Sequence, residues 1–325
     1  MSVQLEEKLG KPGIYTLKKE SLWRHVRKEW KIYTFLIIPV IYFLIFKYAP
    51  MIGNIIAFRK YRGGPNFLGT EWVGFNYFRM FMKDPNFWRA FRNTLSLSII
   101  YLLFRFPLTL GFALLLNELR RIRTKKLVQT ISYLPHFISM VIVAGMIKEL
   151  LSNTGPVNTL LENMGYAKIA FLQLPQWFPT IYIASGIWQG LGWGTILYLA
   201  AMTGINTELY EAAKIDGASR ARLAWHVTIP GILPTVMTLL ILDIGGILGS
   251  NFEKILLLYN PLTYEKADVI STFVYRMGIG GGNFGNTGGN FSYATAVGLF
   301  EGIIGLILVT LANEVSKRTT ETSLW

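Results

Sequence analysis

The chain has 325 residues, of which 52% are hydrophobic and only 16% are charged, and it contains no cysteine. Soluble domains carry about 25% charged residues, so this composition indicates a membrane protein, and its many aliphatic and aromatic side chains exclude a mainly disordered chain. The lack of cysteine excludes disulfides and thiolate metal sites. The net charge of +13 would suggest a nucleic-acid partner in a soluble protein. Here Lys and Arg gather at the ends of apolar runs, so membrane topology explains them and no nucleic-acid partner is expected.

Six apolar runs are long enough to cross a bilayer, which needs about 20 residues per helix. They cover residues 32–53, 93–116, 131–151, 178–203, 232–250 and 293–313. Lipid offers the backbone no hydrogen-bond partners, so each run should be helical, which predicts an all-α membrane protein with six transmembrane helices. The first run follows a polar arm and no small-residue cleavage site follows it, so it is not a cleavable signal peptide.

The distribution of Lys and Arg predicts the orientation. These residues cluster in the N-terminal arm, in the second-to-third and fourth-to-fifth connections, and in the C-terminal tail. With six crossings, all four regions lie on one side, which should be cytoplasmic, as should both termini. This divides the chain into an arm (1–31), a first helix with its outer loop (32–92), a core of five helices (93–318) and a tail (319–325).

The outer loop, residues 54–92, opposes this charge rule because it is also basic and is rich in aromatic residues. We expect it to be a folded cap that lies partly in the membrane interface. Its positive charges could face an acidic partner or an acidic substrate, or they could bind lipid headgroups; the sequence leaves these alternatives open.

The third outer connection, residues 251–292, contains a glycine-rich stretch at 278–289. No predicted strand precedes it and no lysine follows it as a phosphate-binding loop would require, so a flexible loop at the membrane surface is expected.

No pattern of catalytic or metal-binding residues appears in the sequence. It has neither a phosphate-binding G-x-x-x-x-G-K-[ST] loop nor a G-x-S-x-G element. The three histidines, His25, His136 and His226, are far apart in sequence and form no helix-spaced pair. We therefore expect no enzyme and no metal site, and favour a pathway for a polar solute.

The segment 207–234 is too polar to span the bilayer and predicts two short helices. Thr207 should cap the first helix, Gly217 should close it in a left-handed conformation, Ser219 should cap the second helix and Pro230 should end it. Such an exposed bend fits the groove of a partner protein, although an amphipathic helix lying on lipid is an alternative.

This segment resembles the signature of ABC importer permeases. The likeness rests on Glu211-Ala212-Ala213, Gly217 four positions further on, and the Val227-Thr228-Ile229-Pro230 run, with an Asp-Gly-Ala at 216–218 that is typical of carbohydrate importers. The resemblance implies a coupling helix that sits in a cleft of an ATPase subunit, with Glu211 as the polar anchor and Gly217 as the turn. The coupling residues it implies are Glu211, Ala212, Ala213, Asp216, Gly217 and Pro230.

The resemblance extends over about residues 93–318 and is to the maltose-type, polysaccharide branch of the family, including importers of alginate. It is carried by stretches 133–139, 155–158, 252–261 and 268–272. It implies a type I importer permease fold and a multi-pass protein of the bacterial cytoplasmic (inner) membrane. Implied partners are a second homologous permease, two ATPase subunits, an extracytoplasmic solute-binding protein and an oligo- or polysaccharide that could be acidic. ATP and Mg would bind to the ATPase subunits, and no cofactor is expected to bind to this chain.

A sugar pathway needs aromatic faces for stacking and amides or carboxylates for hydroxyl groups. The fourth and fifth predicted spans supply candidates: Trp188, Gln189, Gly190, Trp193, Asp243, Gly246 and Asn251. Of these, the resemblance places Gln189, Gly190 and Trp193 where the family lines its sugar pocket. The alternatives are helix packing or interface anchoring for the tryptophans and close helix packing for the glycines.

Charges inside the membrane usually face a cavity or a partner. Arg105 lies near the middle of the second span and should be structural, with Asp243 as a possible partner that also lines the pathway. Glu253 and Lys254 lie at the outer edge, where water could solvate them. An ion-coupled secondary transporter is the alternative function, but no internal repeat supports it.

Overall fold

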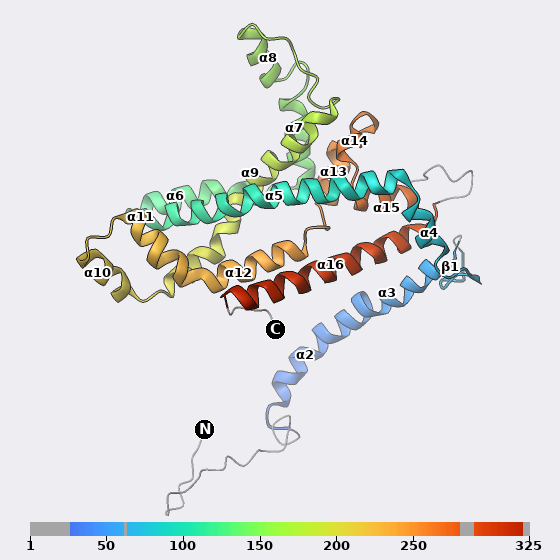
Figure 1. The fold of residues 1–325 in the computed structure, drawn as a ribbon, viewed down its shortest axis with the longest axis horizontal. Coiled ribbons are helices and arrows are strands. Elements are labelled where there is room, and N and C mark those ends of the chain that lie inside the picture. The colour runs from blue at the N-terminus through green and yellow to red at the C-terminus, as the bar shows by residue number, and fades with distance from the viewer. Residues whose placement is uncertain (1–26, 62–63, 280–288, 321–325) are drawn as a thin grey trace, which may run out of the picture. The chain divides into compact units, whose positions relative to one another are not determined.

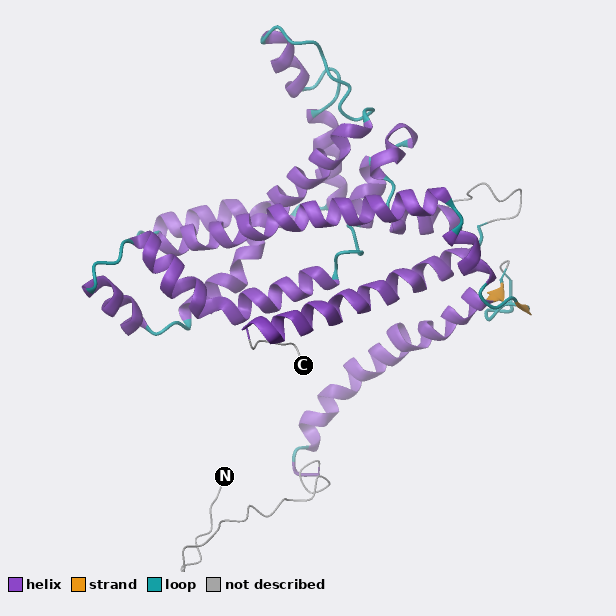
Figure 2. Ribbon diagram, viewed as in Figure 1, coloured by secondary structure: helices purple, strands orange, loops and turns teal. Residues whose placement is uncertain are grey.

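The computed structural model describes residues 27–61, 64–279 and 289–320. Most of the arm, the tail from residue 321 and the glycine-rich residues 280–288, where a flexible loop was expected, lie outside these ranges. The described chain is helical except for its turns, its loops and a single two-stranded sheet (Figure 2). It divides into two compact units, residues 1–53 and 54–325, which are considered separately.

The first unit is a helix through the first predicted span. It consists of α2 (Trp30–Phe43), a π-helical turn η1 (Leu44–Tyr48) and α3 (Ala49–Ile52). Its large apolar side chains are exposed around the whole helix, Phe35 among them. A helix that is apolar on every side is typical of a segment surrounded by lipid.

The outer loop is folded, as expected, and its position in the membrane interface stays a prediction. Helix η2 (Gly53–Phe58) leads into strand β1 (Arg59–Lys60), which pairs antiparallel with β2 (Glu71–Trp72), and α4 (Asn76–Met82) follows. Phe81 of the cap packs with Phe87, Phe273 and Tyr293 in one buried cluster. These partners lie on α5 (Pro85–Glu118), α15 (Ile270–Gly278) and α16 (Phe291–Thr320), so the cap is part of the second unit.

Long helices build this unit: α5 (Pro85–Glu118), α9 (Phe178–Thr203), α12 (Ile229–Gly245) and α16 (Phe291–Thr320). Helix α5 packs most extensively on α9, and α12 lies alongside α16 (Figure 1). Asp84 begins α5, because its side chain accepts the Asn86 amide at 2.8 Å and Pro85 needs no donor in the first turn.

Four helices in the described chain are long and apolar enough to cross a membrane: Tyr33–Phe58, Pro85–Glu118, Arg220–Gly245 and Phe291–Arg318. The broken pair described next would make five. Helix α9 coincides with the fourth predicted span, but it is not among these four; it carries Gln189, Trp193 and several glycines. The count of six therefore stays a prediction.

The third predicted span, 131–151, is wrong as a single helix. Helix α6 (Ile122–Tyr133) already begins in the basic connection, and a 96° bend at η3 (Leu134–Phe137) separates it from α7 (Met140–Leu150). Ile138 is extended, and the Ser139 hydroxyl caps α7 by accepting the Ile142 amide. A proline, Pro135, in the bend cannot donate a hydrogen bond to the preceding turn. Helices α8 (Pro156–Asn163) and η4 (Pro175–Trp177) complete the connection to α9.

Two details of the polar segment also differ from prediction. Asn206, rather than Thr207, caps α10 (Thr207–Ile215), because its side chain accepts the Glu208 amide at 3.0 Å. Pro230 does not end the second helix: α11 (Arg220–Leu223), η5 (Ala224–Thr228) and α12 follow without a break. Pro230 stands in the first turn of α12, next to the π-helical turn, where its missing N–H is tolerated. At its other end, α12 stops at Gly245, whereas the fifth predicted span extended to residue 250.

The outer connection after α12 is mostly helical rather than a loop. It contains α13 (Phe252–Leu258), η6 (Pro261–Thr263), α14 (Tyr264–Ala267) and α15 (Ile270–Gly278). Asp268 is fully buried and holds Arg276 through two hydrogen bonds of 2.7 Å. Asn93 of α5 donates to the carbonyls of Glu265 and Asp268, both at 2.9 Å. These bonds fix the connection onto the membrane helices.

Candidate functional site

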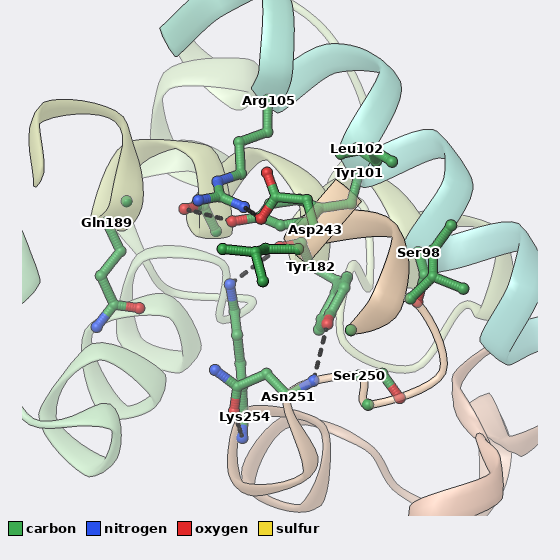
Figure 3. A pocket seen from close by; sticks show the side chains of 16 residues that line it. Ser98, Tyr101, Leu102, Arg105, Tyr182, Gln189, Asp243, Ser250, Asn251 and Lys254 are labelled. Atoms are coloured by element: carbon green, nitrogen blue, oxygen red, sulfur yellow. Dashed lines mark hydrogen bonds and ion pairs between the residues drawn. The ribbon is translucent and has the colours of Figure 1, made fainter. Parts of the chain in front are cut away.

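A cavity of about 470 Å³ lies between α5, α9, the end of α12 and the start of α13. This volume is typical of small-molecule sites, which occupy about 300–1,000 Å³. Figure 3 shows its polar side chains converging from these elements. The lining residues that carry the argument below are Tyr101, Arg105, Tyr182, Asp243, Ser250 and Lys254.

Five of the seven predicted pathway residues line this cavity: Gln189, Gly190, Asp243, Gly246 and Asn251. They come from α9 and from the end of α12 with the cap of α13, more than fifty positions further along the chain, so the structure brings them together as the sugar-pathway hypothesis requires. Gln189 donates to the Ile138 carbonyl at 3.3 Å, which ties α9 to the bend after α6.

The two tryptophans lie elsewhere. Trp193 lines a neighbouring cavity of about 370 Å³ that shares Arg105 and Asp243 with the first, and its ring stacks on His136 at 4.5 Å. Trp188 lines neither cavity and is exposed on α9. The contact of Trp193 with His136 agrees with the alternative that this tryptophan serves helix packing. The exposed position of Trp188 agrees with the alternative that it anchors the helix in the membrane interface.

Arg105 and Asp243 form an ion pair at 2.9 Å in the cavity wall, which confirms the predicted partnership. Both side chains are about 29% exposed, so the pair is largely withdrawn from water. Arg105 also lies 5.8 Å from the centre of the Tyr101 ring. Since each charge offsets the other's burial, removing either one would leave an uncompensated charge beside the cavity.

Lys254 was expected at the outer edge, where water could solvate it, and was not among the predicted pathway residues, but it lines the cavity. It is only 2% exposed, whereas the neighbouring Glu253 is exposed. Its ammonium donates to the Tyr182 carbonyl at 2.9 Å and lies 5.1 Å from the centre of the Tyr182 ring. Lys254 lies outside the four apolar helices, and burial lowers its pKa from 10.5 to about 7. No signal in the sequence around Lys254 shows its burial, because the inward direction of α13 is set by contacts with α9.

Tyr182 holds this corner of the cavity together. Its hydroxyl accepts the Asn251 amide at 3.2 Å, and the Asn251 side chain in turn caps α13 by accepting the Lys254 amide at 3.1 Å. Figure 3 shows both contacts converging on the same side of the cavity. The backbone of α9 therefore sets the position of the lysine on α13.

Glycines in α9 act differently on the two sides of the helix. A side chain on Gly186 would meet the Tyr101 ring at 2.9 Å and the Lys254 ammonium at 3.3 Å, so this glycine keeps the cavity wall open. Gly192 instead packs directly on the backbone of Ser132 in α6. Close helix packing is thus the role of Gly192, and cavity space the role of Gly186.

The polar segment forms an exposed bend at the opposite end of α12. Gly217 closes α10 with φ +75°, and the Ala218 amide returns to the Ala213 carbonyl at 2.9 Å. This is the left-handed closure predicted for Gly217. Apolar Leu209 and Ile215 are 55% and 86% exposed on α10.

The remaining predicted coupling residues lie along the same bend. Glu211, Ala212 and Asp216 are exposed, Ala213 is partly buried, and Pro230 is exposed at the start of α12. The Tyr210 hydroxyl lies 3.0 Å from that of Thr228, which ties α10 to η5. The segment therefore presents short side chains and two apolar ones on a surface that the rest of this chain leaves open.

No group of three or more His, Cys, Asp or Glu side chains that could hold a metal ion occurs among the described residues. The carboxylates near the cavity are engaged with cations or solvated rather than paired with each other: Asp243 binds Arg105 and Glu253 is exposed. This arrangement can bind and orient a polar solute through charges, amides and hydroxyls.

Comparison with known proteins agrees with this geometry. Residues 105–321 match the family described as "Binding-protein-dependent transport system inner membrane component". Protein LplB of Bacillus subtilis (strain 168) is 44% identical over 96% of both chains. The polygalacturonan/rhamnogalacturonan transport system permease protein YteP of the same organism is 42% identical over 95% of this chain and 94% of its own.

A solved structure of a bacterial ABC transporter involved in the import of the acidic polysaccharide alginate superposes with a TM-score of 0.82. It is 44% identical and covers 92% of this chain and 99% of its own. The match extends well beyond the short coupling signature and leaves no support for an ion-coupled secondary transporter. The chain is a multi-pass transport component rather than an enzyme, and it belongs to the family of inner membrane components of binding-protein-dependent transport systems.

Proposed function

We propose that this chain forms half of the membrane passage of an ATP-driven importer whose cargo is an acidic oligo- or polysaccharide. The observation that carries the proposal is the charge of the cavity: two cations, Arg105 and Lys254, face a single carboxylate, Asp243. One positive charge is therefore left without a counter-charge in the cavity wall. A neutral sugar would not compensate it, whereas a carboxylate on the sugar would.

The relatives favour the same cargo chemistry. Polygalacturonan and alginate, named for two of them, are both polymers of uronic acids with a carboxylate on each sugar ring. The cavity also offers neutral partners for sugar hydroxyls, namely Ser98, Gln189, Ser250 and Asn251. A mixture of one surplus cation and several amides and hydroxyls suits a ring that carries one acid and several alcohols.

The partners follow from the same family. We propose a second homologous permease that completes the passage, two ATPase subunits that bind ATP and Mg, and an extracytoplasmic solute-binding protein that delivers the cargo. Helix α10 and the turn at Gly217 would enter a cleft of one ATPase, with Glu211 as its polar anchor. Exposed Leu209 and Ile215 support this contact, since they offer apolar surface that a protein groove could bury.

Coupling of ATP binding to transport then requires only that ATP binding changes the relative stability of the inward-facing and outward-facing states. Closure of the ATPases around ATP would move the bend, and the continuous helix Arg220–Gly245 would carry that movement toward Asp243 and the cavity. ATP binding would favour the outward-facing state to the extent that it binds that state more tightly. This chain performs no covalent step.

The test is reconstitution of the complex with its ATPases and binding protein in vesicles. Uptake of radiolabelled oligogalacturonate or oligoalginate should require ATP and the binding protein. ATP hydrolysis should rise when the loaded binding protein is present. If the vesicles take up a neutral oligosaccharide but neither of the acidic ones, the proposed cargo is contradicted.

A further inference from the structure

Lys254 is unusual because it is a buried cation without a carboxylate partner. Among the residues that the structure describes, no Asp or Glu lies within ion-pair distance of it, and the carboxylate in the same cavity is bound to Arg105. Its ammonium has three donors, of which one reaches the Tyr182 carbonyl. Burial of a charge that is neither paired nor fully hydrogen-bonded is unfavourable, so an anion that entered the cavity and paired with this ammonium would be stabilised there.

A second polar group in the same cavity is also without a partner. The hydroxyl of Ser250 is buried and makes no hydrogen bond within the described chain. Ser250 precedes Asn251, the cap of α13, and Figure 3 shows it next to Asn251, whereas the Lys254 side chain extends toward the middle of the cavity. Buried hydroxyls are rarely left unsatisfied, so this one offers a donor and an acceptor to a bound molecule.

The surroundings hold the Lys254 side chain in place. The Lys254 backbone amide is fixed by the Asn251 cap at 3.1 Å, and its side chain lies beside the Tyr182 ring. A side chain larger than hydrogen at Gly186 would meet the ammonium at 3.3 Å. The lysine is therefore preorganised at one end of the cavity, and the Arg105–Asp243 pair forms another part of its wall.

We propose that Lys254 and Ser250 form a carboxylate-binding subsite that selects uronate sugars during passage through the membrane. The ammonium pairs with the sugar carboxylate, and the serine hydroxyl binds a neighbouring oxygen of the same ring. The Arg105–Asp243 pair stays intact, because its charges already offset each other. This subsite rests on the acidic cargo of the proposed function and assigns the selection of that cargo to the permease itself.

The experiment measures equilibrium binding to the assembled complex, purified with its partner permease and ATPases in nanodiscs and without the binding protein. The two probes are trigalacturonate and its methyl ester, in which a methyl group on each carboxyl removes the negative charge and the sugar rings stay the same. The variants are Lys254→Met and Lys254→Gln, which remove the charge, Lys254→Arg, which keeps it, and Ser250→Ala. Lys266→Met is the matched control, because Lys266 is an exposed lysine in the same outer connection.

The wild type and Lys266→Met should bind the acid about tenfold or more tightly than the ester, as expected for a charge-assisted hydrogen bond. Lys254→Met and Lys254→Gln should abolish this preference by weakening the acid and not the ester, and Lys254→Arg should restore much of it. Ser250→Ala should weaken both probes by a similar, smaller factor. An unchanged preference in either neutral variant of Lys254 would overturn the subsite.

Failure of the subsite and failure of the proposed function are separable. If the wild-type complex imports acidic oligosaccharides but Lys254→Gln keeps full preference for the acid, only the subsite is overturned. If the wild-type complex binds and imports neither acidic nor neutral oligosaccharide, the proposed function is overturned as well. Assembly of each variant is checked by co-purification of the ATPases, and either neutral variant suffices for the test.

Discussion

The cavity and the exposed bend lie at opposite ends of the helix that begins at α11, and they are built in different ways. In the cavity, charged side chains from segments 138 residues apart meet in a buried pair, and Lys254 binds a carbonyl 72 positions away. In the bend, the hydrogen bonds join residues that are two to five positions from each other in sequence; the Tyr210–Thr228 contact is the exception. Buried contacts make the cavity sensitive to single charges, whereas the bend depends on backbone geometry and on surfaces left for a partner.

The largest effect should come from the bend. In Gly217→Pro, the ring requires φ near −65°, whereas the residue has φ +75° and its amide donates to the Lys214 carbonyl at 3.0 Å. A local penalty of about 3 kcal/mol should disrupt the turn, leave the protein inserted and uncouple ATP hydrolysis from uptake. Glu211→Lys should uncouple in the same way, and Lys214→Ala on the same helix is the control. Substrate-stimulated hydrolysis and uptake at wild-type level in both variants would refute docking through this bend.

The ion pair in the cavity should give the next largest effect. Arg105→Met or Asp243→Leu alone should destabilise the protein by about 2–3 kcal/mol, because each leaves one buried charge unpaired. The double variant should recover most of this loss. Unfolding in mixed micelles measures the cycle.

The exposed pair Lys60–Glu71, at 3.4 Å, is the matched comparison for this cycle. Its removal should change stability by less than about 1 kcal/mol, since water screens exposed charges. Equal losses at the two pairs would show that the cavity pair is not set apart by its burial.

Acid binding should depend on pH through Lys254. Because burial places the pKa of this lysine at about 7, the empty site is mostly charged at pH 6 and mostly neutral at pH 8.5. Uronate carboxylates stay ionised throughout, and the Arg105 guanidinium keeps its charge. The attraction is thus present below pH 7 and is lost as pH rises, which should weaken trigalacturonate binding by about tenfold between these values.

Lys254→Arg sharpens this prediction, because a guanidinium does not lose its proton in this range. Titration of trigalacturonate binding in nanodiscs should give a flatter pH profile for this variant than for the wild type. Binding by the wild type that strengthens as pH rises would contradict a charged lysine in the subsite.

The smallest effect should be at the cap of α10. Asn206→Ala removes the side-chain acceptor for the Glu208 amide, which should destabilise the start of this helix by about 1 kcal/mol. Hydrogen exchange in α10 should become faster while exchange in the cavity helices stays the same. Asn206→Asp keeps an acceptor and should exchange as the wild type does, and faster exchange in both variants would argue against the cap.

Much of the bend could be predicted from sequence because its structure is local. A glycine after a short polar helix needs no distant partner to adopt a left-handed turn, so Gly217 was placed correctly. The cap was misplaced by one residue, since Asn206 and Thr207 are both good caps and only the backbone conformation distinguishes them. Pro230 was read as a helix end, but the π-helical turn before it lets the helix continue.

The cavity could be predicted only in part. Asp243 was identified as a partner for Arg105 because charges in a membrane must be compensated, and few acidic residues lie in the apolar runs. The sequence alone predicts that water could solvate Lys254, because nothing near it in sequence shows that α13 turns it inward. The broken third span was missed for a similar reason, since its apolar residues continue through the bend at η3.

The amino-acid sequence by itself determined that the chain is helical and apolar, where its long helices lie and where it makes a polar turn. These properties depend on the solvent around each segment and on a few neighbouring residues. Only the tertiary structure decided which charges meet in one cavity, that Lys254 is buried there without a carboxylate, and that the outer cap packs on α15 and α16. Those features arise from contacts between distant segments, and burial changes the energy of a charge far more than any neighbour along the chain does.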